Sequence, residues 1–264
     1  MQVTLEQRYC ATVAYDGTDF LGYQVQASGR TVQGEIEKCL EQITQTAIRI
    51  DGAGRTDAGV HATGQVIAFN AVWRHRLTDL HRALNATLPA DIVVHKLKIV
   101  DEAFHPRYGA LGRTYCYQII NQQWPEVLTQ RYAYHISTPL DVAALQVASK
   151  TLIGHYDFAS FGKPPQGSNT LRHVSQAYWQ KGEGNYLTFY ITANAFLYRM
   201  VRKIVGTLLQ VGLGRLSCAD VQRILDQRDL TQSAPPAPAH GLCLTNVIYP
   251  DEVFGVSARG ETLS

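Results

Sequence analysis

A short stretch rich in glycine carries the residues best suited to chemistry: Gly52-Ala53-Gly54-Arg55-Thr56-Asp57-Ala58-Gly59-Val60-His61. Three glycines within eight residues supply backbone freedom that a helix or strand does not need, so they predict a tight loop that a ligand can approach closely. Asp57 is the only acid of this loop and stands among small side chains. A carboxylate presented in this way can act as a nucleophile or as a general base.

Two other interpretations compete with a catalytic Asp57. The spacing G-x-G-x-x-x-x-G suggests a phosphate-binding loop, but it matches neither the dinucleotide fingerprint nor the Walker A motif, and an acid would repel phosphate. Aspartate is also a common turn residue, because its carboxylate bonds its own backbone. For an isolated loop the turn interpretation is the more common outcome, so the choice depends on the remaining chain.

The composition is that of a folded, reduced protein. The 264 residues are 45% hydrophobic and 17% charged, enough for one large domain or two small ones. The first eight residues have no apolar core of signal-peptide length, and three cations interrupt the most apolar stretch, residues 196–213, so no membrane span is expected. The five scattered cysteines and nine histidines show no metal-ligand spacing, which indicates reduced thiols, a cytoplasmic protein and no metal site.

Basic residues occur in clusters, although the net charge is only +2. The clusters are Arg74-His75-Arg76 with His81-Arg82, His105 with Arg107 and Arg113, Arg172-His173, and Arg199 with Arg202-Lys203. One such cluster is more often a solvated surface. Several together make a basic groove for nucleic acid plausible.

The first half of the chain alternates between strand and helix periodicity. Alternating apolar residues predict strands over residues 9–15, 47–51, 65–69 and 92–100. Helical spacing predicts one helix behind a Thr31 cap and another behind Thr78, which Pro89 stops. The loop with Asp57 lies between the second and third strands, so the order is βαββαβ.

The second half repeats this order without obvious sequence identity. Strands are predicted over residues 113–120, 173–180, 186–192 and 242–249. One helix is predicted to start at a capping box in residues 138–141, with proline at the first helical position. A second is predicted over residues 196–211, and a third behind a Ser217 cap. The proline-rich stretch 234–239 precedes a strand, so we expect an ordered loop near the site.

A βαββαβ unit is the ferredoxin-like motif, in which two helices cover one face of an antiparallel sheet. Two tandem units joined edge to edge bury two edge strands. We therefore expect an α+β fold in which residues 1–104 and 105–264 together form one domain with one extended, mainly antiparallel sheet. Helices should cover one face, and a ligand cleft should lie on the other. The site would lie between the halves.

The chain resembles the tRNA pseudouridine synthase A family in six blocks that occur in the family's order. They are residues 15–24 (YDGTDFLGYQ), 54–61 (GRTDAGVH), 104–107 (FHPR) with 113–117 (RTYCY), 155–161 (HYDFASF), 194–206 (NAFLYRMVRKIVG) and 238–242 (PAHGL). Two departures are visible: Tyr23 stands where the family often has tryptophan or phenylalanine, and Gly109 where serine is common.

This resemblance implies isomerisation of uridine to pseudouridine at positions 38–40 of the tRNA anticodon stem-loop, by a homodimer without an organic cofactor. It implies that Asp57 is the catalytic aspartate, that Arg202 pairs with it, and that Arg55 helps to turn the base out. Tyr115 would lie against the target base. We expect Tyr115 and His61 to belong to the substrate-binding part of the site. From the sequence alone, Tyr115 is more often a strand residue of the core, and Arg202 is as often a surface arginine. His61 either orients the Asp57 loop or bonds a nearby carbonyl.

Two alternative functions belong to other classes. A non-catalytic RNA-binding dimer would use the basic groove alone, but it leaves Asp57 unexplained among groups that face phosphates. A nucleotide-dependent oxidoreductase would need a helix after the glycine-rich loop, where the pattern predicts a strand.

Overall fold

The computed structural model describes residues 6–164 and 167–250, so the outer ends of the two expected halves, residues 1–5 and 251–264, lie outside it. The strands are β1 (Gln7–Tyr15), β2 (Asp51–Gly52), β3 (His61–Ala71), β4 (Ile92–Ile99), β5 (Gly112–Asn121), β6 (Tyr134–Ile136), β7 (Gly154–Asp157), β8 (Leu171–Lys181), β9 (Tyr186–Ala193) and β10 (Leu242–Ile248). The helices are α1 (Val32–Thr44), α2 (Leu77–Thr87), α3 (Val142–Lys150), α4 (Met200–Gly212) and α5 (Cys218–Gln227), with short 3-10 turns at Ala159–Phe161 and Ala239–Gly241.

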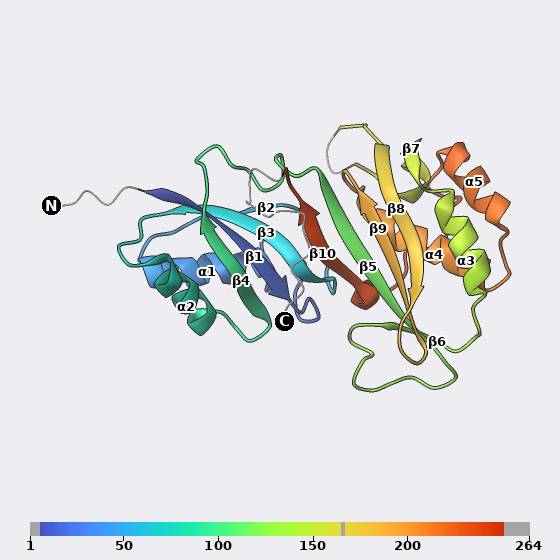
Figure 1. Cartoon of the computed structure of the whole chain (residues 1–264), viewed down its shortest axis with the longest axis horizontal. Coiled ribbons are helices and arrows are strands. Elements are labelled where there is room, and N and C mark those ends of the chain that lie inside the picture. The colour runs from blue at the N-terminus through green and yellow to red at the C-terminus, as the bar shows by residue number, and fades with distance from the viewer. Residues whose placement is uncertain (1–5, 165–166, 251–264) are drawn as a thin grey trace, which may run out of the picture.

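All ten strands form one sheet with the order β4-β1-β3-β10-β5-β9-β8-β7, while β2 pairs with β3 and β6 with β5 (Figure 1). The first half contributes β4-β1-β3-β2 and the second contributes β10-β5-β9-β8, so both halves have the same strand arrangement. Among the described pairings only β3–β10 and β5–β6 are parallel. The predicted α+β class, with two ferredoxin-like units in one mainly antiparallel sheet, is confirmed.

The two halves meet where β3 and β10 run side by side. Cys243 pairs with His61 and Leu244 with Ala62 in parallel register. A Cβ atom on Gly64 would lie 2.1 Å from the carbonyl oxygen of Thr245, so only glycine permits this approach. Because β10 pairs only with the first residues of β3, the loop from β2 into β3 ends beside this junction.

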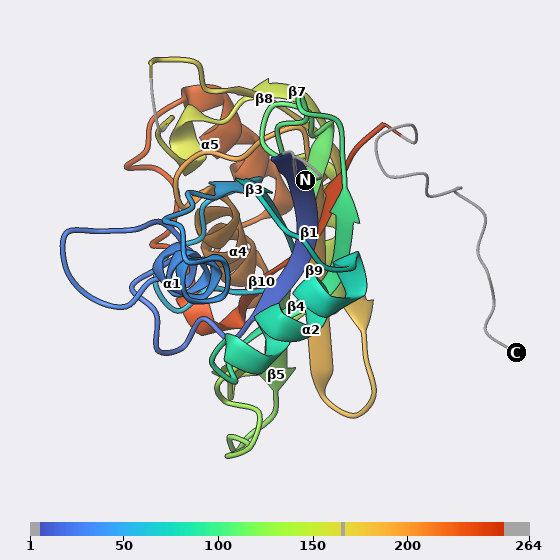
Figure 2. The ribbon, with the colours of Figure 1, turned by 90° about the vertical axis from the view of Figure 1, so that its left-hand side faces the viewer.

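The helices bury the apolar stripes that their sequences predict. In α1 the buried residues are Val32, Ile36, Cys39 and Leu40, and the Thr31 hydroxyl caps the helix by accepting from the amide of Gly34 at 3.2 Å. The Ser217 capping box of α5 is also present. Figure 2 shows α1 and α4 on the same side of the sheet. In the described part of the chain no helix has the length and apolar character needed to cross a bilayer.

Three predicted helix starts are wrong, and the strand predicted over residues 47–51 is confined to Asp51–Gly52. The second helix begins at Leu77 rather than behind Thr78, and its N-cap, Arg76, makes no side-chain capping bond. The third begins at Val142 because Asp141 caps it by accepting from the amide of Ala144 at 2.9 Å, so the predicted proline position precedes the helix. The fourth begins at Met200, four residues later than predicted.

Candidate active site

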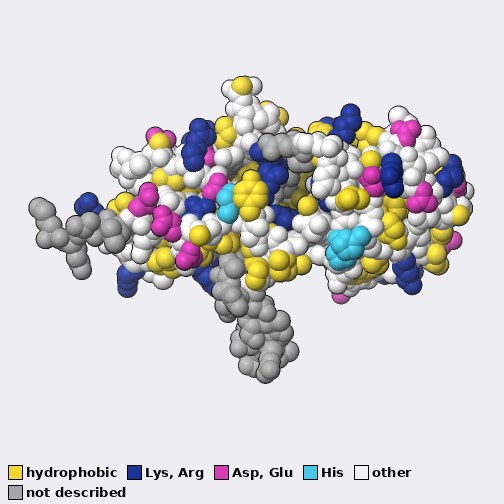
Figure 3. Space-filling view, turned by 90° about the horizontal axis from the view of Figure 1, so that it is seen from above, with side chains coloured by type: hydrophobic (Ala, Val, Ile, Leu, Met, Phe, Trp, Pro, Cys, Tyr) yellow, Lys and Arg dark blue, Asp and Glu magenta, His cyan; other side chains and the backbone are white. Residues whose placement is uncertain are grey.

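A cleft of about 1040 Å³ lies between the two halves of the sheet. Figure 3 shows it as a hollow in which lysine and arginine side chains gather. The charged residues that line it are Arg55, Arg107, Arg113, Lys163, Arg199 and Arg202, with the carboxylates Asp51 and Asp57. Cations therefore outnumber acids three to one, which suits a polyanion. Of the four basic clusters in the sequence, only those around Arg107 and Arg202 line the cleft.

The cleft lies on the helix-bearing side of the sheet, and the expected position on the helix-free face is wrong. Its lining includes Gln33 of α1 and the first turn of α4. Tyr115 lines it from β5, and Tyr117, two residues further along the same face, is fully buried. Because α1 and α4 belong to different halves, the space between their first turns stays open.

Three side chains and one backbone amide from separate segments hold the Asp57 loop in place. The Gln65 amide donates to the carbonyl of Gly54 at 2.8 Å, and the buried Arg113 guanidinium donates to the carbonyl of Ala53 at 2.9 Å. The Tyr15 hydroxyl bonds that of Thr56 at 2.8 Å, while the Tyr23 amide donates to the Thr56 carbonyl at 3.1 Å. The loop is thus held from both halves of the chain.

Asp57 forms an ion pair with Arg202 across the cleft. Nη1 of Arg202 lies 3.0 Å from Oδ2 of Asp57, although 145 residues separate them in sequence. The Arg202 side chain is 14% exposed and that of Asp57 23%. Nε of Arg202 donates to the carbonyl of Ala237 at 2.7 Å, which orients the guanidinium. A charge-assisted bond between partly buried groups holds the carboxylate in one orientation.

The proline-rich loop before β10 is ordered, as predicted, and it supports this arginine. Ala237 is buried and donates its amide to the carbonyl of Arg202 at 2.9 Å. A Cβ atom on Gly206 would lie 2.2 Å from the carbonyl oxygen of Pro235, so α4 and the loop pack backbone to backbone. The position of Arg202 is therefore set by this contact as well as by its helix.

Arg199 also approaches Asp57, a contact that was not predicted from the sequence. Its Nε lies 4.0 Å from Oδ2 of Asp57, and its side chain is 48% exposed. The available signal was its spacing of three residues from Arg202, because residues i and i+3 share a helix face. Sequence could not show that α4 starts one residue after Arg199.

Tyr115 is buried at the wall of the cleft, 5.1 Å from Phe196 between ring centroids in an edge-to-face arrangement. Burial raises its pKa to about 12, with a smaller opposing effect of Arg113. The phenol is therefore neutral at physiological pH and can donate a hydrogen bond or a proton. The structure brings Tyr115, Asp57 and Arg202 to one cleft.

The stability of the protein at alkaline pH tests whether the phenols of Tyr115 and Tyr117 are buried. Burial raises the pKa of Tyr115 and of Tyr117 above the ordinary value of 10.0. Above pH 10 the unfolded chain loses these protons while the folded chain keeps them, so stability is complete below pH 10 and falls toward pH 12. The loss is about 1.4 kcal/mol per pH unit for each such tyrosine. Urea unfolding at pH 9, 10 and 11 measures it, and Tyr115→Phe should make the decline shallower. An equal decline in that variant would contradict the assignment.

Arg55 and His61 occupy different surroundings. Arg55 is exposed and lines the cleft. His61 is buried and does not belong to the lining. Both interpretations of His61 agree with its contacts, because one ring nitrogen bonds the loop after β1 and the other lies beside the carbonyl of Arg131.

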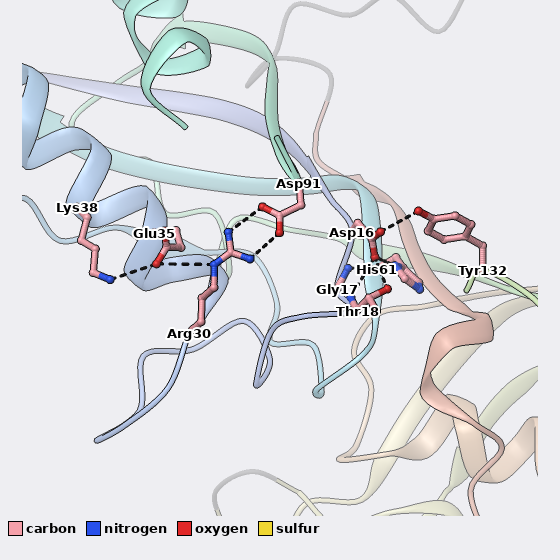
Figure 4. Close-up of polar contacts among 9 residues, drawn as sticks. All are labelled: Asp16, Gly17, Thr18, Arg30, Glu35, Lys38, His61, Asp91 and Tyr132. Carbon is pink, nitrogen blue, oxygen red and sulfur yellow. Dashed lines mark hydrogen bonds and ion pairs between the residues drawn. The ribbon is translucent and has the colours of Figure 1, made fainter. Parts of the chain in front are cut away.

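Figure 4 shows how His61 connects three segments. Its Nδ1 accepts from the amide of Gly17 at 3.0 Å and lies 3.1 Å from Oδ1 of Asp16. The other carboxylate oxygen of Asp16 accepts from the Tyr132 hydroxyl at 2.8 Å. Nε2 of His61 lies 3.0 Å from the carbonyl of Arg131. His61 therefore fastens the start of β3 to the loops after β1 and β5, and this holds the end of the Asp57 loop.

The three glycines of the loop have different surroundings. Gly59 has φ +76°, which side chains rarely adopt, and Gly54 faces open space. A Cβ on Gly52 would lie 2.3 Å from the Tyr23 hydroxyl, so this glycine makes room for a tyrosine. The Tyr23 hydroxyl is buried and has no hydrogen-bond partner in the described chain.

The Tyr23→Phe variant tests how much this buried, unpaired hydroxyl lowers the free energy of unfolding. We expect Tyr23→Phe to leave the free energy of unfolding unchanged or raise it by up to about 1 kcal/mol, because a buried polar group without a partner is unfavourable. The matched control is Tyr15→Phe, which loses the buried bond to Thr56 and should cost about 1–3 kcal/mol. Urea denaturation measures both, and a Tyr23→Phe protein as destabilised as the control would contradict the expectation.

Fold and site together define an α+β protein with an arginine-held carboxylate in a cation-rich cleft. The glycine-rich loop leads into β3 and not into a helix, so the dinucleotide-binding alternative fails. The sequence profile of tRNA pseudouridine synthase matches residues 11–109 and 148–250, stretches that contain Asp57 and Arg202. Tyr115 lies between them.

Curated relatives are similar to this chain along nearly its whole length. The tRNA pseudouridine synthase A of Halalkalibacterium halodurans is 43% identical over 87% of this chain and 88% of its own. That of Bacillus subtilis is 41% identical over 92% and 99%, and that of Chloroflexus aurantiacus 44% over 90% and 87%. The chain belongs to the tRNA pseudouridine synthase family. It is accordingly an isomerase that converts uridine to pseudouridine in tRNA.

Proposed function

We propose that this chain modifies uridines at positions 38–40 of the tRNA anticodon stem-loop in the cytoplasm, with Asp57 as the group that acts at the ribose. The observation that carries the proposal is the 3.0 Å pair between Asp57 and Arg202 inside a cation-rich cleft. Because one partner comes from residues 1–104 and the other from residues 105–264, the two halves act as one catalytic domain.

The reaction breaks the bond between N1 of uracil and C1′ of ribose, turns the base, and joins C5 to C1′ with loss of the C5 proton. An ionised carboxylate can attack C1′ to form a sugar ester, or it can remove the C2′ proton to form a glycal. Arg202 holds the Asp57 carboxylate in place for either route. Deuterium at C2′ separates them, because only the glycal route breaks the C2′–H bond and gives a primary isotope effect.

A uridine in a helical stem must leave its stack before the ribose is reached, at a cost of a few kcal/mol. Stacking on an aromatic ring returns about 1–3 kcal/mol per base. Tyr115 lines the cleft and supplies that ring in this proposal, and its neutral phenol can deliver a proton to the product base. The exposed guanidinium of Arg55, in the same loop as Asp57, helps to turn the base out. His61 holds the loop and does not touch the base.

Product mapping tests the position of modification. The purified protein is incubated with an unmodified tRNA transcript that carries uridine at positions 38, 39 and 40, and pseudouridine is located by mass spectrometry. Product confined to these positions supports the proposal, and product only in another arm refutes it. Release of tritium from C5-labelled uridine distinguishes the enzyme from a non-catalytic RNA-binding dimer, which releases none.

A homodimer is part of this proposal. The loop between β5 and β6 carries Trp124, Val127 and Leu128, three of the most exposed large hydrophobic side chains. A cluster of this kind supports a surface for self-association. Sedimentation of the wild type and of Leu128→Glu tests it: a wild-type monomer refutes the dimer, and a dimer that persists in the variant moves the contact elsewhere.

A further inference from the structure

Two arginines approach one carboxylate, and their surroundings differ. Arg202 is 14% exposed, lies 3.0 Å from Asp57 and is fixed by Ala237. Arg199 is 48% exposed and lies 4.0 Å from the same oxygen. Its guanidinium is 4.9 Å from the centroid of the exposed Tyr198 ring. Arg202 makes the short hydrogen bond to Asp57, whereas Arg199 makes only a long contact and keeps a half-exposed guanidinium that another anion can reach.

The backbone of Arg199 is in a conformation that helix capping does not explain. It has φ 59° and ψ 12° and precedes α4 as its N-cap, a position that normally has extended backbone, and it makes no capping bond. The other non-glycine residues with positive φ in the described chain are Gln45 and Arg228, which end helices, where this conformation is common. A non-glycine residue held in left-handed backbone is strained, and such strain is concentrated at functional sites.

Hydrogen bonds on both sides hold this conformation. The amide of Tyr198 donates to the carbonyl of Lys163 at 2.9 Å, and the carbonyl of Arg199 accepts from the amide of Lys203 at 3.0 Å. The backbone is thereby fixed while the side chain stays half-exposed over the cleft. This arrangement aims a long cationic side chain at the opening beside Asp57.

We propose that Arg199 is a phosphate-binding residue of the cleft, whose guanidinium moves from the edge of Asp57 to a phosphodiester next to the target nucleotide when RNA binds. The inference rests on the proposed function. A half-exposed ion pair at 4.0 Å is weak, so leaving it costs little. A guanidinium binds phosphate oxygens in a bidentate manner that a lysine cannot match. In the free enzyme the same guanidinium offsets the negative charge of Asp57, which would otherwise repel the incoming phosphate.

Affinity and its salt dependence test the proposal with an anticodon stem-loop RNA. We expect Arg199→Gln to weaken binding about tenfold and to lower the slope of log K against log salt by about one, because one phosphate contact is lost. The Arg199→Gln substitution should reduce RNA affinity more than it reduces kcat. Arg199→Lys should keep the slope and recover part of the affinity. The matched control is Arg228→Gln, which removes another exposed arginine with positive φ that pairs with Asp157 outside the cleft lining.

Two further measurements separate binding from folding. Arg199→Gly relieves the backbone conformation, so its Tm should be no lower than that of the wild type while its affinity falls. RNA with a neutral methylphosphonate at the contacted linkage should bind the wild type more weakly, yet bind Arg199→Gln no worse than unmodified RNA does. Unchanged affinity and slope in Arg199→Gln, or equal losses for every linkage in both proteins, would overturn the proposal. If wild-type protein forms no pseudouridine in the stem-loop, the proposed function fails instead.

Discussion

Asp57→Asn should lower the rate of pseudouridine formation by about 10³–10⁴-fold, the size of effect expected when a reacting acid–base or nucleophilic group is removed. The amide keeps the shape of the carboxylate but can neither attack C1′ nor take up the C2′ proton. Because shape is preserved, tRNA affinity should stay within about tenfold of the wild type. Single-turnover assays with C5-tritiated tRNA measure the rate, and filter binding measures the affinity.

The matched control for this variant is Asp51→Asn. Asp51 lines the same cleft, but its carboxylate pairs with Arg8 at 2.8 Å and not with Arg199 or Arg202. Its loss should reduce turnover less than tenfold. Turnover by Asp57→Asn at more than about one hundredth of the wild-type rate, with Asp51→Asn as the more damaged protein, would remove Asp57 from its proposed role.

Arg202→Gln should reduce kcat by about 10²–10³-fold and the free energy of unfolding by about 2–3 kcal/mol. Removing one partner leaves the Asp57 carboxylate without its 3.0 Å contact and the Ala237 carbonyl without its donor. The cost is below the 3–5 kcal/mol of a fully buried pair because both side chains are partly exposed. Steady-state kinetics and urea unfolding measure the two effects.

A double-mutant cycle determines whether Arg202 acts through Asp57. If it does, Arg202→Gln should slow the Asp57→Asn enzyme much less than it slows the wild type, since the carboxylate is already absent. Arg202→Lys should restore little, because an ammonium group cannot reach both the carboxylate and the Ala237 carbonyl in the same fork geometry. Independent, multiplicative losses in the double variant would show that Arg202 contributes through another contact.

Local patterns in the sequence predicted most elements of this protein and drew attention to the carboxylate of Asp57. Alternating and helical apolar spacing report which face of an element is buried, so they predicted the order of strands and helices apart from the short strands β6 and β7. Cap chemistry is equally local, and the Thr31 and Ser217 caps are present as predicted. The loop with Asp57 stood out because small residues surround one acid, and the family resemblance then supplied its partner.

Tertiary structure decided which face holds the cleft, because the open space lies between the first turns of helices from different halves and neither helix pattern describes that space. It also decided the start of α4, since the left-handed backbone of Arg199 is held by a contact between Tyr198 and Lys163. The same contact brings Arg199 to Asp57. Periodicity describes neighbours within one element, whereas the distance between Asp57 and Arg202 depends on how two halves join at β3 and β10.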